Sequence, residues 1–321
     1  METTEKVLHL LSTSSKEYLS GETLARELGM SRTAIWKAIK SLQQQGHNIV
    51  SKPRLGYHYI DNQALNEYII HNFLNKDLTL QFEVHEKLKS TNLRAKEIAF
   101  EPINQPYIIL SDYQTNGYGR RGRHFSSPAQ TGIYLSILLN TQNTTLNPGL
   151  LTTATALAVT RTIEKELGET PQIKWVNDVL LNNKKIAGIL TEAVMDFENQ
   201  QIKNVIIGVG INYLSDYIDF PDELQDIVGT LKDAALKANI SRNQFIASFL
   251  NEFFALYQNY QAANFMPEYR EHSAVIGKEV TITQGKETFN QVVTNIDDQG
   301  CLILQDGTRL NSGEVTKIRT V

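Results

Sequence analysis

Residues 117–123, Gly-Tyr-Gly-Arg-Arg-Gly-Arg, interleave three glycines with three arginines and are named the Gly-Arg loop here. Glycine permits backbone conformations and close approaches that a Cβ atom would block. Arginine carries a permanent positive charge on a planar group that suits carboxylates and phosphates. The composition therefore predicts a flexible loop that closes on an anionic small molecule. A solvated basic loop without a ligand is the alternative.

The Gly-Arg loop formally matches the dinucleotide-binding pattern G-x-G-x-x-G, but its surroundings do not. A dinucleotide site places a strand before the loop, a helix after it, and an acidic residue about 20 positions later. Here residues 107–111 and 133–139 both have the pattern of strands, and no Asp or Glu occurs between Asp112 and Glu164. The sequence therefore predicts a loop between two strands and argues against a dinucleotide site.

A second group of reactive side chains follows later in the sequence. Lys174–Asp178 (KWVND) places one basic and two polar side chains around an aromatic ring. Lys185 follows an Asn-Asn turn, at the start of an apolar strand of small residues. A partly buried lysine is costly unless an anion pairs with it. Residues 205–212 are another apolar strand, and they end in the polar Asn212. These segments predict a second anion-binding element.

Ser90, Thr91 and Asn92 stand between an alternating segment at residues 80–85 and an amphipathic segment at residues 93–99. Their small hydroxyl and amide groups at a strand-to-helix junction suit a neutral polar ligand. A plain helix N-cap is the alternative. Two longer helical segments are expected to be structural, at residues 149–167 and at residues 241–260.

The first 60 residues predict a separate helix-turn-helix unit. A short helical segment at residues 6–11 is followed by a second helix, which Ser20-Gly21-Glu22-Thr23 opens and Gly29 ends. Ser31 is a plausible N-cap for a third helix. That helix has an apolar stripe of Ile35, Ala38, Ile39 and Leu42, and it leaves a basic face outward.

Two short alternating segments, at residues 48–52 and 57–60, predict a hairpin that would form the wing of a winged helix-turn-helix. Lys52 and Arg54 at its tip could reach phosphates. A protein-interaction module with merely solvated charges is the alternative. The candidate DNA-binding residues are Gly21, Ser31, Arg32, Thr33, Trp36, Lys37, Lys40 and Arg54.

The composition sets limits on the whole chain. Its 321 residues allow two or three domains. A formal charge of −4 argues against a protein that coats nucleic acid over its whole surface, but it allows one basic module. Cys301 is the only cysteine, so neither a disulfide framework nor a cysteine-based metal site is expected. No secretory or membrane-spanning pattern is found, which predicts a soluble cytoplasmic protein without a membrane partner.

The motifs at residues 117–123, 174–178, 185–190 and 208–212 occur in the order and rough spacing of the biotin protein ligases. With the winged helix, the whole chain resembles the bifunctional BirA-type biotin ligases and biotin-operon repressors. The resemblance implies an α+β fold in three domains. These are a winged helix-turn-helix at residues 1–63, a mixed-sheet α/β ligase domain at 64–272, and an SH3-like β-barrel at 273–321, where short strands alternate with glycine turns.

The resemblance also implies a reaction. Biotin and ATP, the latter with bound Mg²⁺, would form biotinoyl-5′-adenylate and pyrophosphate. A lysine of the biotin carboxyl carrier protein of acetyl-CoA carboxylase would then take the biotin. A homodimer formed with adenylate bound would repress biotin synthesis genes at an operator DNA. Two alternatives are a winged-helix repressor that senses another anionic metabolite, and a lipoate-type ligase.

The matching positions receive roles from the family. Arg120 and Lys185 would be catalytic, and no protein metal ligands are implied. The biotin site would comprise Ser90, Thr91, Asn92, Gln114, Tyr118, Gly119, Arg120 and Lys185. The ATP and adenylate site would comprise Gly117, Arg121, Arg123, Phe125, Asn177, Asp178 and Asn212.

Three positions depart from the family pattern. Tyr118 stands where an arginine is common, so only its backbone is expected to contact the ligand. Val176 replaces a usual proline, which loosens the expected turn. Phe125 occupies a position often held by tryptophan, which puts adenine packing there in doubt.

Overall fold

The computed structural model describes residues 3–14, 18–44, 47–60, 63–141, 146–196 and 201–318. These form two compact units, Met1–Leu74 with Ser241–Ala247, and Asn75–Ile240 with Ser248–Val321. The domain boundaries expected after residues 63 and 272 stay predictions. Within the described ranges, none of the helices combines the length and the apolar character that crossing a bilayer requires.

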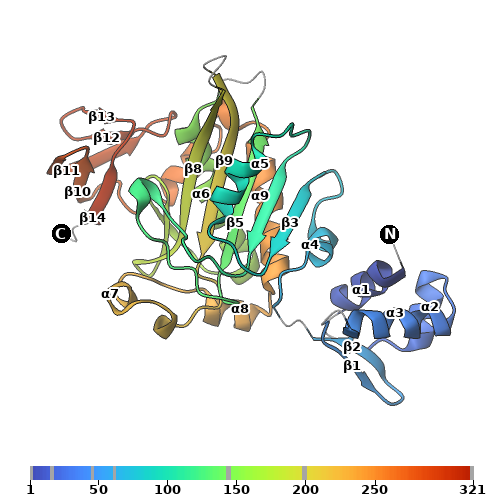
Figure 1. The fold of residues 1–321 in the computed structure, drawn as a ribbon. Helices are drawn as coiled ribbons and strands as arrows, with labels where there is room; N and C mark the ends of the chain where they lie inside the picture. Colours follow the sequence, from blue (N-terminus) through green and yellow to red (C-terminus); the bar gives the residue numbers. More distant parts are fainter. Residues whose placement is uncertain are drawn as a thin grey trace. The chain divides into compact units, whose positions relative to one another are not determined.

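The N-terminal unit contains the predicted helices and hairpin (Figure 1). Its elements are α1 (Thr3–Thr13), α2 (Gly21–Leu28), α3 (Arg32–Gln44), β1 (Ile49–Lys52), β2 (Gly56–Tyr59) and α4 (Glu67–Phe73). The predicted stripe of α3 is buried in one core with Leu8, Leu11 and Leu24. The helices and the turn that the apolar periodicity predicted for this segment are therefore confirmed.

The turn signals of this unit act as expected. Ser20 caps α2 by accepting a hydrogen bond of 2.9 Å from the Thr23 backbone N–H. Gly29 ends α2 with a φ of 65°, a left-handed conformation that glycine adopts without strain. Ser31 accepts a hydrogen bond of 3.1 Å from the Ala34 backbone N–H at the start of α3. Local residue types thus set both ends of the turn between α2 and α3.

A seven-stranded mixed sheet forms the centre of the larger unit, in the order β3-β4-β5-β9-β8-β7-β6. The strands are β3 (Gln81–His85), β4 (Tyr107–Ser111), β5 (Ile133–Asn140), β6 (Gln172–Lys174), β7 (Asp178–Leu181), β8 (Lys184–Asp196) and β9 (Gln201–Ile211). Strands β3 and β4 are parallel, and the other neighbours are antiparallel. The predicted strands around the Gly-Arg loop are therefore adjacent and antiparallel.

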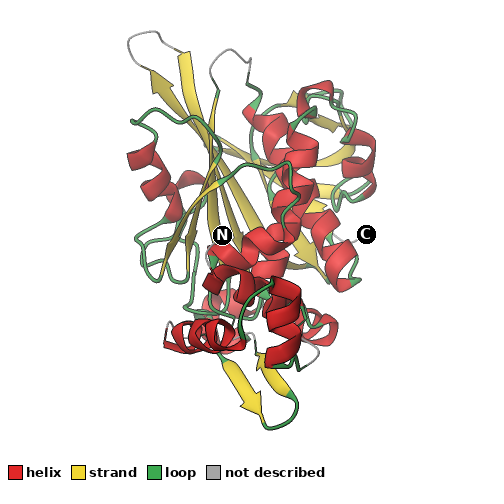
Figure 2. Cartoon of the chain, turned by 90° about the vertical axis from the view of Figure 1, so that its right-hand side faces the viewer, coloured by secondary structure: helices red, strands yellow, loops and turns green. Residues whose placement is uncertain are grey.

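Helices lie on both faces of this sheet (Figures 1 and 2). The α-helices are α5 (Thr91–Ile98), α6 (Pro148–Leu167), α7 (Asp222–Gln225), α8 (Lys232–Ala238), α9 (Arg242–Tyr257) and α10 (Met266–Glu271). Short 3-10 helices are η1 (Arg120–Gly122), η2 (Tyr217–Asp219) and η3 (Tyr260–Ala262). Helix α5 packs on β4, β5 and β9, while α6 packs on β6, β7 and β8. The expected structural role of the segment at 149–167 is confirmed by its burial.

The C-terminal segment forms a five-stranded antiparallel sheet in the order β13-β12-β11-β10-β14. Its strands are β10 (Glu279–Gln284), β11 (Glu287–Ile296), β12 (Leu302–Leu304), β13 (Arg309–Leu310) and β14 (Glu314–Ile318). Positive φ angles of 60°, 75° and 85° at Gly285, Gly300 and Gly307 confirm the predicted turns. The Trp175 indole N–H donates a hydrogen bond of 2.9 Å to the Gly300 carbonyl, which joins this sheet to the KWVND segment.

Candidate active site and DNA-binding surface

The Gly-Arg loop folds back on itself between β4 and β5. The Phe125 N–H donates to the Gly117 carbonyl at 2.8 Å, and the Gly119 N–H donates to the Arg123 carbonyl at 2.8 Å. A Cβ atom at Gly117 would lie 2.7 Å from both the Phe125 carbonyl oxygen and the Ser127 hydroxyl oxygen. Glycine is thus required at this position because the loop closes on its own backbone.

A buried polar cluster lies at the start of α5. The Thr91 backbone N–H donates to Gln114 Oε1 at 2.8 Å, and Gln114 Nε2 donates to Ser127 Oγ at 2.9 Å. The Ser136 hydroxyl donates to Asn92 Oδ1 at 2.5 Å and lies 2.8 Å from the Thr91 hydroxyl oxygen. All five side chains are buried. Three of the predicted biotin residues are therefore brought into contact, and Ser136 and Ser127 join them.

Ser90 occupies the N-cap position of α5, but its side chain makes no cap hydrogen bond. The plain N-cap alternative therefore does not explain this triplet. Gly208 on β9 leaves room for the Asn92 side chain, because a Cβ atom at position 208 would lie 2.3 Å from Asn92 Oδ1. The cluster is packed tightly enough to require glycine on the facing strand.

The Tyr118 side chain takes part in a network that the sequence did not predict. Its hydroxyl donates to Glu192 Oε2 at 2.8 Å and accepts from Lys96 Nζ at 3.1 Å. Lys96 also pairs with Glu192 Oε1 at 2.8 Å, and Asn92 Nδ2 donates to Glu192 Oε2 at 2.8 Å. Two signals were available in the sequence: Asn92 and Lys96 are four residues apart on one helix, and Glu192 is an acidic residue on a largely apolar strand.

Burial and hydrogen bonding act in opposite directions on Glu192. Burial favours a higher pKa, but hydrogen bonds from Lys96, Asn92 and Tyr118 lower the pKa of Glu192 below its ordinary value. For Tyr118, burial is the main reason that the phenol pKa is raised. At neutral pH the pair therefore consists of an ionised carboxylate and a protonated phenol.

Lys185 is partly buried, as expected, and its anionic partner in this structure is Asp178. The Lys185 Nζ lies 2.6 Å from Asp178 Oδ1, and the Lys174 Nζ lies 3.5 Å from Asp178 Oδ2. The side chain of Lys185 is 31% exposed. Asn182 and Asn183, with φ angles of 52° and 62°, form the predicted turn that places Lys185 opposite β7. One carboxylate thus holds two ammonium groups.

Arg120 lies beside the same segment. Its Nη1 donates to Asn177 Oδ1 at 3.2 Å, and Asn177 Nδ2 donates to the Ile189 carbonyl at 3.0 Å. Burial lowers the pKa of Arg120 from its usual value, although a guanidinium keeps its charge at neutral pH. The adjacent residues Asn177 and Asp178 therefore hold the two predicted catalytic cations, Arg120 and Lys185.

Arg121 and Arg123 are directed to the C-terminal sheet instead. Arg121 Nη2 donates to the Thr283 carbonyl at 3.4 Å, and Arg123 forms an ion pair with Glu314. The backbone of Arg121 has a φ of 57°, which is uncommon for a residue with a side chain. These two arginines are thus not brought to the cluster that contains Arg120.

The Phe125 ring packs over two glycines of the central sheet. A Cβ atom at Gly210 would lie 2.5 Å from Phe125 Cε1, and one at Gly188 would lie 3.5 Å from Cε2. Asn212 is buried close by, and its Nδ2 donates to the Gly229 carbonyl at 2.9 Å. The Phe125 ring therefore lies against β8 and β9, and Asn212 Nδ2 also lies 3.3 Å from the Lys185 carbonyl of β8. The contact of both residues with ATP stays a prediction.

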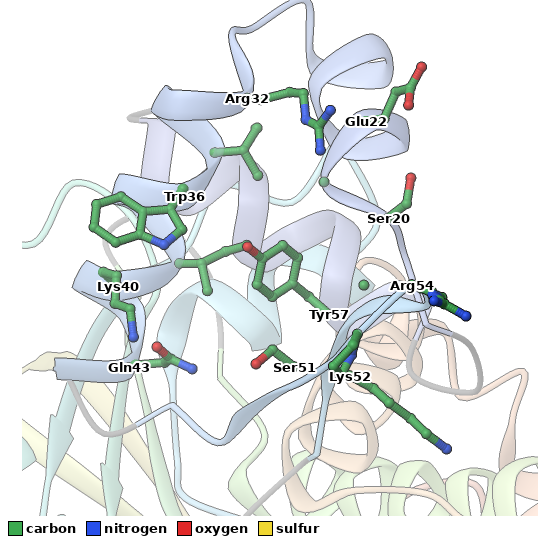
Figure 3. A pocket seen from close by; sticks show the side chains of 15 residues that line it. Ser20, Glu22, Arg32, Trp36, Lys40, Gln43, Ser51, Lys52, Arg54 and Tyr57 are labelled. Carbon is green, nitrogen blue, oxygen red and sulfur yellow. The ribbon is translucent and has the colours of Figure 1, made fainter.

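The N-terminal unit has a hollow of about 580 Å³ between α3 and the β1–β2 hairpin. Five predicted DNA-binding residues line it, and in Figure 3 Trp36 and Lys40 come from α3 while Arg54 comes from the hairpin. These five are Gly21, Arg32, Trp36, Lys40 and Arg54. Ser31, Thr33 and Lys37 are exposed but do not line it.

Trp36 is 52% exposed, which is unusual for a large apolar side chain. No ion pair joins Lys37, Lys40 or Arg54 to an acidic side chain within the described part of the chain. A face that combines an exposed aromatic ring with exposed cations has the character of a surface that contacts nucleic acid.

The acidic, histidine and cysteine side chains of the described ranges do not cluster. No group of three or more His, Cys, Asp or Glu side chains is placed to hold a metal ion there. Asp178, the acidic residue that contacts Lys185, is paired with Lys174 and Lys185.

Comparison with known proteins agrees with this arrangement. The profile of the biotin/lipoate A/B protein ligase family matches residues 84–212, and an HTH domain profile matches residues 3–58. Biotin protein ligase from Aquifex aeolicus, solved in complex with biotin and ATP, superposes with a TM-score of 0.62 and 22% identity. That match covers 75% of this chain and 99% of the Aquifex chain, and at this identity it shows the fold alone.

Two curated relatives match nearly the full length. The bifunctional ligase/repressor BirA of Bacillus subtilis (strain 168) is 34% identical over 304 residues, which cover 93% of each protein. The bifunctional ligase/repressor BirA of Escherichia coli (strain K12) is 28% identical over 307 residues, which cover 94% of this chain and 92% of the relative. The chain belongs to the BirA family of bifunctional biotin–protein ligases and repressors.

Proposed function

We propose that the chain joins biotin to ATP, forming biotinoyl-5′-adenylate and pyrophosphate, and then transfers biotin to a lysine of the biotin carboxyl carrier protein of acetyl-CoA carboxylase. The observation that carries this proposal is the placement of Arg120 and Lys185. Two cations are held by neighbouring residues of one segment, at 3.2 Å from Asn177 and 2.6 Å from Asp178. Both steps of the reaction bring anionic oxygens together, and cations in fixed positions stabilise such charge.

In the first step the biotin carboxylate attacks the α-phosphorus of ATP, and pyrophosphate leaves. Lys185 exchanges its contact with Asp178 for the biotin carboxylate and then for the adenylate phosphate. Arg120 lies over the junction of carboxylate and phosphate, and retains the reactive anhydride. The backbone of the Gly-Arg loop covers the adenylate, and Gly117 allows the loop to close tightly. In the second step the ε-amine of the carrier lysine attacks the acyl carbon, and AMP leaves.

The buried cluster around Ser90, Thr91, Asn92 and Gln114 recognises the uncharged ureido ring of biotin. Thr91, Asn92 and Gln114 are held by hydrogen bonds among themselves, Ser127 and Ser136, so they are pre-organised to meet a polar ligand. Phe125, Asn177, Asp178 and Asn212 face the nucleotide. Mg²⁺ would enter together with ATP and would offset the negative charge of its phosphates.

The winged helix binds an operator of biotin synthesis genes. The adenylate-bound loop supports a homodimer, which presents two winged helices to a pseudo-palindromic site. The five C-terminal strands form an SH3-like barrel that supports ATP and docks the carrier domain. The protein acts in the cytoplasm, where ATP is available. A chain with one cysteine and therefore no internal disulfide suits that reducing compartment.

One assay tests the enzymatic proposal. The protein is incubated with ATP, an isolated carrier domain, and either biotin or lipoate. We expect biotin-dependent pyrophosphate release followed by a mass increase on the carrier lysine. Release that depends on lipoate would identify a lipoate-type ligase, and no release with either acid would indicate a repressor that senses another metabolite. Specific DNA binding at fixed salt should tighten when biotin and ATP are added.

A further inference from the structure

We propose that Glu192 is a positioning residue that fixes the amide of Asn92 in the biotin pocket and, through Tyr118, ties the Gly-Arg loop to that pocket. This inference rests on the proposed biotin ligase function. It assigns a task to a carboxylate that the family motifs do not include.

The carboxylate of Glu192 is the meeting point of two parts of the site. Its Oε2 atom accepts hydrogen bonds of 2.8 Å from Asn92 Nδ2 and of 2.8 Å from the Tyr118 hydroxyl. Its Oε1 atom pairs with Lys96 Nζ at 2.8 Å. Asn92 lies in the pocket and Tyr118 lies in the loop, so one side chain on β8 contacts both.

The ionised carboxylate determines which way the Asn92 amide faces. An ionised carboxylate can only accept hydrogen bonds, so the NH₂ group of Asn92 must face Glu192. The amide oxygen then faces Ser136, whose hydroxyl donates to it at 2.5 Å. The second N–H of Asn92 has no partner within the described part of the chain. This donor is suited to the carbonyl oxygen of a neutral cyclic urea.

The segment that directly follows the Gly-Arg loop is joined to the same pocket. Ser127 donates to the Phe125 carbonyl at 3.1 Å and accepts from Gln114 Nε2 at 2.9 Å. Gln114 in turn accepts from the Thr91 N–H at 2.8 Å. The loop therefore reaches the pocket through Tyr118 and Glu192, and the segment that follows the loop reaches it through Ser127 and Gln114. Ordering the pocket and closing the loop share this network.

The chain contains a close match for Glu192 that lacks the pocket contact. Glu83 on β3 accepts from Arg94 at 2.9 Å and from the Tyr107 hydroxyl at 3.0 Å. Its side chain is 21% exposed, compared with 23% for Glu192. Both carboxylates thus accept from a cation of α5 and from a tyrosine, but Glu83 contacts none of the pocket residues.

The experiment is a calorimetric titration of biotin into the full-length protein without ATP. We expect Glu192→Gln to raise the biotin Kd by about tenfold or more, because the loss of a charged hydrogen-bond acceptor frees the Asn92 amide to turn. The ATP Kd should change by less than about twofold. Glu83→Gln, the matched control, should leave the biotin Kd within about twofold of the unaltered protein.

A second variant tests the loop separately. Tyr118→Phe keeps the ring and removes the hydroxyl that contacts Glu192, so preformed biotinoyl-adenylate should dissociate about five times faster or more. Unchanged biotin affinity in Glu192→Gln, or an equal loss in Glu83→Gln, would overturn the pocket assignment. An unchanged dissociation rate in Tyr118→Phe would overturn the loop assignment. If the unaltered protein itself bound no biotin, the proposed function would fall, and this inference with it.

Discussion

The cations of the N-terminal unit and those of the larger unit differ in how they are held. Lys37, Lys40 and Arg54 are exposed and have no ion-pair partner within the described residues. Arg120 and Lys185 are partly buried and are held by Asn177 and Asp178. Exposed, unpaired cations attract a long polyanion through counterion release, with little dependence on exact position. Cations that are held in fixed positions act on a small anion at one place, where a displacement of about 1 Å lowers the reaction rate.

The largest expected effect is that of removing a held cation. Lys185→Ala should slow adenylate formation by roughly 100-fold or more, because an electrostatic stabiliser of the transition state is lost. The measurement is single-turnover release of pyrophosphate with biotin and ATP. Lys184→Ala is the matched control, since the Lys184 ammonium lies 4.7 Å from the centre of the Tyr217 ring and not on Asp178. Similar rates in the two variants would remove Lys185 from the reaction.

The next effect concerns retention of the intermediate. Arg120→Gly should increase release of biotinoyl-adenylate by about tenfold or more, because the guanidinium beside Asn177 no longer covers it. Free adenylate would then biotinylate exposed lysines of a bystander protein, which a streptavidin blot detects. Arg121→Gly should not do this, since Arg121 contacts the Thr283 carbonyl instead. Labelling confined to the carrier domain in Arg120→Gly would contradict the assignment.

A smaller effect is expected for the exposed cations. Lys40→Ala should make the negative slope of log K for DNA against log salt shallower by about 0.9, because one phosphate contact is lost. The ligase reaction of this variant should match that of the unaltered protein. A fluorescence-anisotropy titration at several salt concentrations measures the slope. An unchanged slope would show that Lys40 does not contact phosphate, and would weaken the contrast between the two sets of cations.

The smallest expected effect is on the stability of α3, the helix that carries the predicted DNA-binding residues. Ser31→Ala removes the hydroxyl that accepts from the Ala34 N–H, and should lower the stability of the N-terminal unit by about 1 kcal/mol. Chemical denaturation followed by the fluorescence of Trp36 measures this when Trp175, in the larger unit, is replaced by Phe in both proteins. Ser31→Asp, which keeps a capping oxygen, should restore most of the loss. No change in Ser31→Ala would mean that the cap adds nothing to α3.

The two regions also differ in how far the sequence predicted them. The stripe of α3 and the capping residues Ser20 and Ser31 act on neighbours three or four positions away, so local patterns were sufficient. The same holds for the Asn182-Asn183 turn, which brings Lys185 to its strand.

In the larger unit, the contacts of the site residues are made with partners from distant parts of the chain. Arg123 pairs with Glu314, 191 positions later, and Tyr118 contacts Glu192, 74 positions later. No local pattern reveals such pairs. The expectation that the backbone of Tyr118 contacts the ligand stays a prediction, but the sequence did not reveal that its side chain makes two hydrogen bonds and a ring contact with Lys96.

The most direct test of the account offers the protein equal amounts of biotin and lipoate together with ATP labelled at its α-phosphate. Mass spectrometry then identifies the acyl-adenylate that remains bound to the protein. The account predicts biotinoyl-5′-adenylate from the unaltered protein, and its near absence from Lys185→Ala. Lipoyl-adenylate as the main product, or no acyl-adenylate from either protein, would contradict it.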